Sequence, residues 1–140
     1  MEEPGARILG IDPGTKRTGI AVSDPLGVTA QGLETFVSGG GITLLDHLRS
    51  VVGRYGVGLV VVGMPLSMSG GEIEGTERSR RLAEEIRTEL DIEVALRDER
   101  MTSREAERLM QRSGGVREKG DIDRIAAVLL LQGYLDERDS

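Results

Sequence analysis

Residues 7–24, RILGIDPGTKRTGIAVSD, decide the fold because they encode a β-hairpin with a carboxylate at its turn. Two runs rich in Ile, Leu and Val, residues 7–12 and 18–24, flank the turn sequence PGTKR at residues 13–17. Asp12 closes the first run. We therefore expect a hairpin that presents Asp12 where its first strand meets the turn.

The rest of the chain predicts a mixed α/β sheet. Residues 28–36 would add a third strand to the hairpin as an antiparallel meander, and the apolar run VGLVVV at 57–62 has the character of a strand buried on both faces. Apolar residues at helical spacing from Ile42 to Val52 and from Thr76 to Leu90 predict helices, and residues 92–96 alternate like a strand. Strands that alternate with helices pair in parallel through right-handed crossovers. We expect five strands, three antiparallel and two parallel, with helices on both faces.

Two further helices are expected after the last strand. Thr102 and Glu105 form a capping box that would start the first, and Asp121 or Ile122 would open the second. The final helix is apolar around most of its circumference, which predicts burial between layers or against a partner subunit. The pattern therefore permits a homodimer without requiring one.

Composition limits the classes of function. The 140 residues suit one domain spanning 1–140, and no apolar run approaches the roughly 20 residues needed to cross a bilayer. Absence of cysteine suits a reducing cytosol, so we expect a soluble cytoplasmic protein with no membrane contact. A net charge of −6 argues against coating nucleic acid through a broad positive field. Any contact with nucleic acid must be local.

Acidic residues follow or face the carboxyl ends of the predicted strands, where sites form in open sheets. They are Asp12, the pair Asp98 and Glu99, and the pair Asp121 and Asp123. Carboxylates without cysteine suit Mg²⁺ or Mn²⁺, and two such ions about 3.5–4 Å apart would stabilise both the attacking and the leaving oxygen in phosphodiester hydrolysis. Each acid also has a structural interpretation: Asp12 as a turn former, Asp121 as a helix cap, Asp123 as a first-turn acid.

Basic residues beside these acids are candidates for binding phosphate: Lys16, Arg17, Arg100 and Lys119. Ordinary solvation of a turn is the alternative for them. His47 is expected to be exposed, and three scattered aromatic residues are too few for a base-stacking platform. The glycine-rich residues 63–75 lack the Gly-Lys-Ser/Thr of a phosphate-binding P-loop.

Four blocks in order resemble the YqgF/RuvX family: IDPGTKRTGIAVSD, VVVGMPLSMSG, RDERMTSREAERL and KGDIDRIAAVLLLQGYLD. This resemblance implies an RNase H-like fold and a nuclease site formed by Asp12, Glu99 and Asp123, acting on precursor 16S rRNA or on Holliday junctions. The related RuvC-type resolvases carry a fourth acid three residues before the last one, and that position is Gly120 here. Asp121 or Asp98 would have to substitute for it.

The resemblance implies hydrolysis of RNA by a metal-activated water. Structured RNA and precursor ribosomal particles are the partners that it implies. Branched DNA is the nearest rival substrate. Two interpretations from other classes remain: a non-catalytic RNA-binding module associated with the ribosome, and an ATP-binding unit, because Asp-x-Gly-Thr-x-x-x-Gly also occurs in actin-like ATPases. Those ATPases need two such domains, and this chain supplies one.

Overall fold

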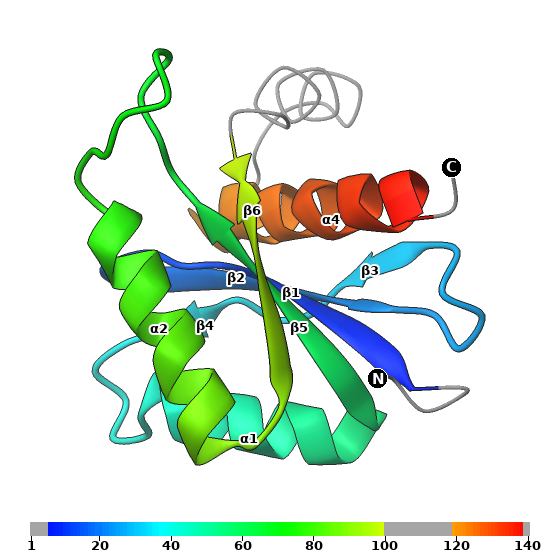
Figure 1. Ribbon diagram of the computed structural model, residues 1–140. Coiled ribbons are helices and arrows are strands. Elements are labelled where there is room, and N and C mark those ends of the chain that lie inside the picture. Colours follow the sequence, from blue (N-terminus) through cyan, green and yellow to red (C-terminus); the bar gives the residue numbers. More distant parts are fainter. Residues whose placement is uncertain (1–5, 100–118, 139–140) are drawn as a thin grey trace.

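The computed structural model describes residues 6–99 and 119–138, which form one mixed sheet with helices on both faces (Figure 1). The strands run in the spatial order β3-β2-β1-β5-β6, and β4 also pairs with β2. The predicted helix from Thr102 and most of the loop before the last helix lie outside the described residues. The elements are β1 (Arg7–Asp12), β2 (Arg17–Ser23), β3 (Ala30–Gly32), β4 (Phe36–Val37), α1 (Leu44–Tyr55), β5 (Val57–Met64), α2 (Thr76–Glu89), β6 (Glu93–Asp98) and α4 (Lys119–Arg138).

The predicted hairpin is confirmed. β1 and β2 pair antiparallel, with Asp12 opposite Gly19 at the turn end. β5 adds in parallel to β1, and β6 adds in parallel to β5. The carboxyl ends of β1, β5 and β6 therefore meet at one edge of the sheet, which is where the acids were expected.

The third strand of the meander is interrupted. A continuous strand over residues 28–36 was expected, but two short strands, β3 and β4, pair with opposite ends of β2. The backbone between them turns aside, although the amide of Leu33 still donates to the carbonyl of Ile20 at 2.8 Å. The intervening residues instead bind the start of α4, as described below.

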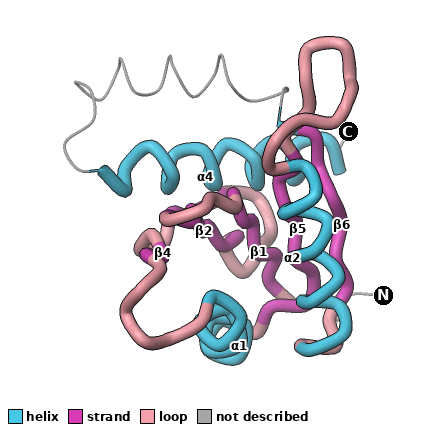
Figure 2. The backbone as a smooth tube through the Cα atoms, turned by 90° about the vertical axis from the view of Figure 1, so that its left-hand side faces the viewer, coloured by secondary structure: helices cyan, strands magenta, loops and turns pink. Residues whose placement is uncertain are grey.

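Side chains that alternate along the strands fill two separate cores. Helices α1 and α2 cover one face, and α4 covers the other, so the molecule has three layers (Figure 2). The first core includes Leu9, Ile11, Ile20, Val22, Val60 and Val62 from the sheet. The second core includes Ile8, Ala21, Leu59 and Val61 from the sheet and Ala127, Leu130, Leu131 and Leu135 from α4.

Helix α1 starts later than its apolar pattern suggested. Thr43 is the N-cap, and its hydroxyl accepts from the amide of Asp46 at 3.1 Å. Ile42 therefore precedes the helix and is 61% exposed rather than buried. Gly56 ends the helix in the left-handed conformation, with φ of 65°. His47 is half-buried and lies against the ring of Phe36, so the expectation that it is exposed was wrong.

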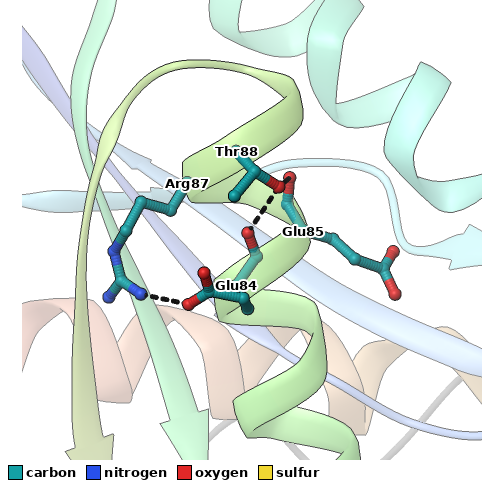
Figure 3. A network of polar contacts seen from close by, with 4 residues as sticks. All are labelled: Glu84, Glu85, Arg87 and Thr88. Atoms are coloured by element: carbon teal, nitrogen blue, oxygen red, sulfur yellow. Dashed lines mark hydrogen bonds and ion pairs between the residues drawn. The ribbon is translucent and has the colours of Figure 1, made fainter.

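Helix α2 has the amphipathic pattern predicted for it. Its buried stripe consists of Thr76, Ser79, Leu82, Ala83 and Ile86. On the opposite face, Arg87 donates to the Glu84 carboxylate at 2.6 Å, and the Thr88 hydroxyl donates to the Glu84 carbonyl at 2.9 Å (Figure 3). Exposed pairs of this kind contribute at most about 0.5 kcal/mol, so burial of the stripe holds the helix in place.

Helix α4 is helical from Lys119, two residues before the predicted start at Asp121. One side of the helix is buried on the sheet, while Ile125, Ala126 and Leu129 on its other sides are half-buried. Among the described residues α4 therefore forms an outer layer, and the predicted burial is met only on the side that faces β1 and β2. None of the described helices is long and apolar enough to cross a membrane.

Candidate active site

Asp12, Glu99 and Asp123 lie on the face of the sheet that α4 covers. Asp12 is the last residue of β1, two positions on from Gly10 and four from Ile8, which both face α4. Glu99 directly follows β6, and Asp123 belongs to the beginning of α4. The strand β5 separates β1 from β6, so the carboxyl groups of Asp12 and Glu99 must meet across it.

Gly63 of β5 is what allows the Glu99 side chain to reach Asp12. A Cβ atom at Gly63 would lie 2.4 Å from Oε1 of Glu99 and 3.0 Å from its Cδ. The Glu99 side chain therefore crosses the sheet in the space that any other residue at this position would fill. On the far side of β5 its carboxyl group shares a hydrogen bond with that of Asp12.

Gly19 sets the position of Asp123 in the same way. A Cβ atom at Gly19 would lie 1.9 Å from the carbonyl oxygen of Asp123, so the backbone of α4 rests directly on β2 at this point. Gly19 is also the residue paired with Asp12 in the hairpin. One contact thus fixes the start of α4 beside the end of β1.

The interruption between β3 and β4 holds the same end of α4 from another direction. The hydroxyl of Thr35 donates to the carbonyl of Gly120 at 2.8 Å, and Nε of Arg124 donates to the carbonyl of Leu33 at 3.1 Å. A regular strand would use its backbone groups for pairing and could not direct them toward the helix. The irregular backbone between β3 and β4 therefore helps to hold the start of α4, which carries Asp123.

The carboxyl groups of Asp12 and Glu99 have perturbed pKa values. Burial raises the pKa of Glu99 to about 9, helped by its hydrogen bond to Asp12 and by the charges of Asp12 and Asp98. Burial also raises the pKa of Asp12; the hydrogen bond to Glu99 opposes this shift, and the charge of Asp123 adds to it. At neutral pH Glu99 is therefore protonated and donates to the Asp12 carboxylate.

Arg17 contacts Asp123 at the edge of this site. Nε of Arg17 donates to Oδ2 of Asp123 at 3.2 Å, joining residues 106 positions apart. Lys16, by contrast, is exposed in the turn. Of the other predicted phosphate-binding residues, Arg100 lies outside the described residues, and Lys119 is placed only as the first described residue of α4.

The two acids considered as substitutes for a fourth ligand are placed differently. Asp121 lies in the first turn of α4 rather than at its cap, and Arg124 donates to it at 3.5 Å. Asp98 is the last residue of β6, and alternation along the strand directs it to the face opposite Arg97, away from α4. Its charge still acts on Glu99.

The chemistry of these side chains fits a hard divalent cation. Asp12 and Glu99 offer oxygen ligands, and a cation would relieve the crowding of negative charge that a shared proton relieves now. Within residues 6–99 and 119–138, no three acidic or histidine side chains converge closely enough to surround an ion as they stand. Asp123 is instead engaged by Arg17.

The sequence pointed to the acids but missed the residues that place them. No sequence pattern gave Gly19 or Thr35 a role, and Gly63 was considered only as the start of the glycine-rich residues 63–75. A glycine inside an otherwise apolar strand is a sign of close approach by another segment, and both glycines carried that signal. Nothing local marks Thr35, because its partner is 85 residues away.

The chain is similar to known proteins over nearly its whole length. Residues 6–137 match the family described as "RuvX: Holliday junction resolvase". A relative from Koribacter versatilis named "Putative pre-16S rRNA nuclease" is 44% identical over 143 residues, covering 99% of this chain and 94% of the relative. A relative of the same name from Lactococcus lactis subsp. cremoris is 45% identical over 136 residues and covers 94% of each chain.

Solved structures share the fold at low sequence identity. RuvC of T. thermophilus in complex with a Holliday junction substrate has a TM-score of 0.63 at 16% identity, with 96% of each chain covered. The Fowlpox virus resolvase in complex with Holliday junction DNA has a TM-score of 0.57 at 17% identity, covering 96% of this chain and 99% of that one. The layers and strand order described above, together with these relatives, show that the chain belongs to the RuvX family and has its RNase H-like fold.

Proposed function

We propose that this protein is a nuclease that hydrolyses phosphodiester bonds with Mg²⁺ or Mn²⁺ held by Asp12, Glu99 and Asp123. The observation that carries the proposal is that the Glu99 side chain crosses β5 over Gly63 to meet the Asp12 carboxyl group, where burial raises the pKa of both acids. Burying two acids against each other destabilises a fold unless they share a proton or bind a cation. Such an arrangement supports a binding role better than a structural one.

Each side chain has a distinct task in this proposal. Asp12 and Glu99 provide ligand oxygens from opposite sides of β5, and Asp123 closes the site from α4. A bound divalent cation supplies charge stabilisation for the attacking and leaving oxygens of the phosphodiester. Two ions would make this a two-metal site; Asp121, in the first turn of α4, is then the further ligand, because Asp98 lies on the opposite face of the sheet.

Cations around the acids would bind the substrate backbone. Lys16 lies in the hairpin turn and Arg17 opens β2 at the same edge of the sheet, while Arg100 and Lys119 are close in sequence to Glu99 and Asp123. A net charge of −6 limits attraction to this local group of cations. We expect affinity to depend on a few phosphates near the cleaved bond.

Structured RNA is the proposed substrate. Relatives from several bacteria that cover most of this chain carry a name that refers to precursor 16S rRNA. We infer that the protein matures the 5′ end of that RNA on precursor ribosomal particles in the cytosol, as one domain spanning residues 1–140. The family description names Holliday junctions instead, so branched DNA is the second candidate substrate.

The test compares both substrates with matched variants. Precursor 16S rRNA and a four-way DNA junction are incubated with Mn²⁺ and the wild type, Asp12→Asn, Glu99→Gln or Asp136→Asn. Asp136 is exposed near the end of α4 and serves as a control for loss of one charge. We expect the first two variants to lose at least about 100-fold in rate and the control to retain it.

The outcome decides between the candidates. Cleavage of the RNA alone or of the junction alone assigns the substrate. Binding of precursor RNA without cleavage by any variant would indicate a non-catalytic module. Wild-type rates in Asp12→Asn would show that the proposed site is wrong.

A further inference from the structure

Arg17 is bonded to one of the three site acids rather than directed to solvent. Its Nε donates to Oδ2 of Asp123 at 3.2 Å, and the two side chains are 35% and 23% exposed. Among the described side chains, the Arg17 guanidinium makes this bond through Nε, and its two outer nitrogens make none. The guanidinium therefore occupies, as a single positive charge, one side of the carboxylate that a divalent cation would need.

The backbone of Arg17 is fixed, so only its side chain can move. Arg17 opens β2 and is paired with Val37 of β4. The turn before it is tight, because a Cβ atom at Gly14 would lie 2.1 Å from the carbonyl oxygen of Arg17. A change of partner must therefore come from rotation of the side chain about this fixed point.

Electrostatics make the guanidinium and a divalent cation competitors for Asp123. Both are positive, so they repel each other at short range in this partly buried site. A half-exposed ion pair of the Arg17–Asp123 kind is weak, so a divalent ion held by two further carboxyl groups can displace it. The displaced guanidinium is then free at the edge of the site, and its planar fork matches a phosphate group.

We infer that Arg17 exchanges partners: it holds Asp123 in the metal-free protein, yields that carboxylate to the metal, and then binds substrate phosphate. The inference rests on the proposed metal site. It makes phosphate binding by Arg17 conditional on an occupied site, so substrate is gripped when the protein is ready to cleave it. A purely structural Arg17 would instead hold α4 in place in every state.

Metal binding separates these two roles. Mn²⁺ affinity is measured by isothermal titration calorimetry, without substrate, for the wild type, Arg17→Gln and Lys16→Gln. Lys16→Gln is the matched control, because it removes one charge from the same turn without releasing Asp123. We expect Arg17→Gln to bind Mn²⁺ about three- to tenfold more tightly and Lys16→Gln to stay within about twofold of the wild type.

The affinity for RNA provides a second test of the exchange of partners. With Ca²⁺ in place of Mn²⁺, Arg17→Gln should bind a labelled precursor RNA several-fold more weakly than the wild type despite its higher metal affinity. Arg17→Lys keeps the charge but lacks the planar fork, so it should restore only part of the RNA binding. Thermal unfolding of each variant checks that the fold is intact.

The possible failures are distinct. Equal or weaker Mn²⁺ binding by folded Arg17→Gln would overturn the exchange of partners while leaving the metal site intact. Equal Mn²⁺ binding by the wild type and Asp12→Asn would instead overturn the proposed site itself.

Discussion

Replacing Glu99 by Gln should stabilise the metal-free protein at neutral and alkaline pH. Glu99 is protonated when folded, with a pKa raised to about 9 from 4.5, and donates to the Asp12 carboxylate. A Gln amide is neutral, has nearly the same shape and can make the same donation. The substitution thus keeps the hydrogen bond and removes the group that resists ionisation.

The size of the effect follows from proton linkage. Because the folded-state pKa of Glu99 lies above its unfolded value, its contribution to stability is fully present below about pH 4.5 and is lost as pH rises toward 9. One retained proton changes the free energy of unfolding by about 1.36 kcal/mol per pH unit. Between about pH 5 and pH 8 this amounts to at most about 4 kcal/mol. Screening by solvent at the site edge lowers the expected difference to between about 2 and 4 kcal/mol.

Urea unfolding with a chelator at several pH values between about 5 and 8 measures this dependence. The wild type and Glu99→Gln should have similar unfolding free energies near pH 5 and diverge steadily above it, with the variant more stable. Glu85→Gln is the control, because Glu85 is exposed on α2 (Figure 3). Parallel curves for the wild type and Glu99→Gln would refute the shared proton on which the site is built.

Three further outcomes test the placement of the site. Gly63→Ala should displace the Glu99 side chain, lowering the nuclease rate by about an order of magnitude or more in a cleavage assay. Urea unfolding should show a stability cost of about 1–3 kcal/mol. An unchanged rate would show that the crossing of Glu99 over β5 is unimportant. Thr35→Val should cost about 1 kcal/mol in unfolding free energy by loss of its bond to Gly120, and no loss would mean that α4 is held without it. Mn²⁺ at about 100 times its dissociation constant should stabilise the wild type by about 2.7 kcal/mol in thermal or urea unfolding but not Asp12→Asn, and equal stabilisation would place the ion elsewhere.

The same carboxyl pair links stability and function in opposite directions. A buried carboxyl pair that keeps a proton in the metal-free protein can exchange that proton for a cation, so a variant that removes the ionisable group is expected to be more stable and less active. Glu99→Gln should show both changes together. Loss of activity without the gain in stability would separate catalysis from the electrostatics described here.

Two features of the fold could not be read from local pattern. Residues 28–36 alternate loosely enough to predict a continuous strand, yet the backbone breaks between β3 and β4 and binds α4 through Leu33 and Thr35. The last helix extends back to Lys119, so Asp121 is a first-turn residue paired with Arg124 rather than the cap. In both cases the deciding contact lies about 90 residues away, beyond any local signal.

The sequence by itself determined the hairpin, the two parallel strands and the helices α1 and α2, and it named candidate acids at strand ends, because periodicity, turn residues and strand ends are local properties. Only the tertiary structure decided how those acids meet. Gly63 lets Glu99 cross β5 to Asp12, and Gly19 lets α4 bring Asp123 to the end of β1. A glycine allows another segment to approach closely, and which segment approaches is known only from how the neighbouring strand and helix pack.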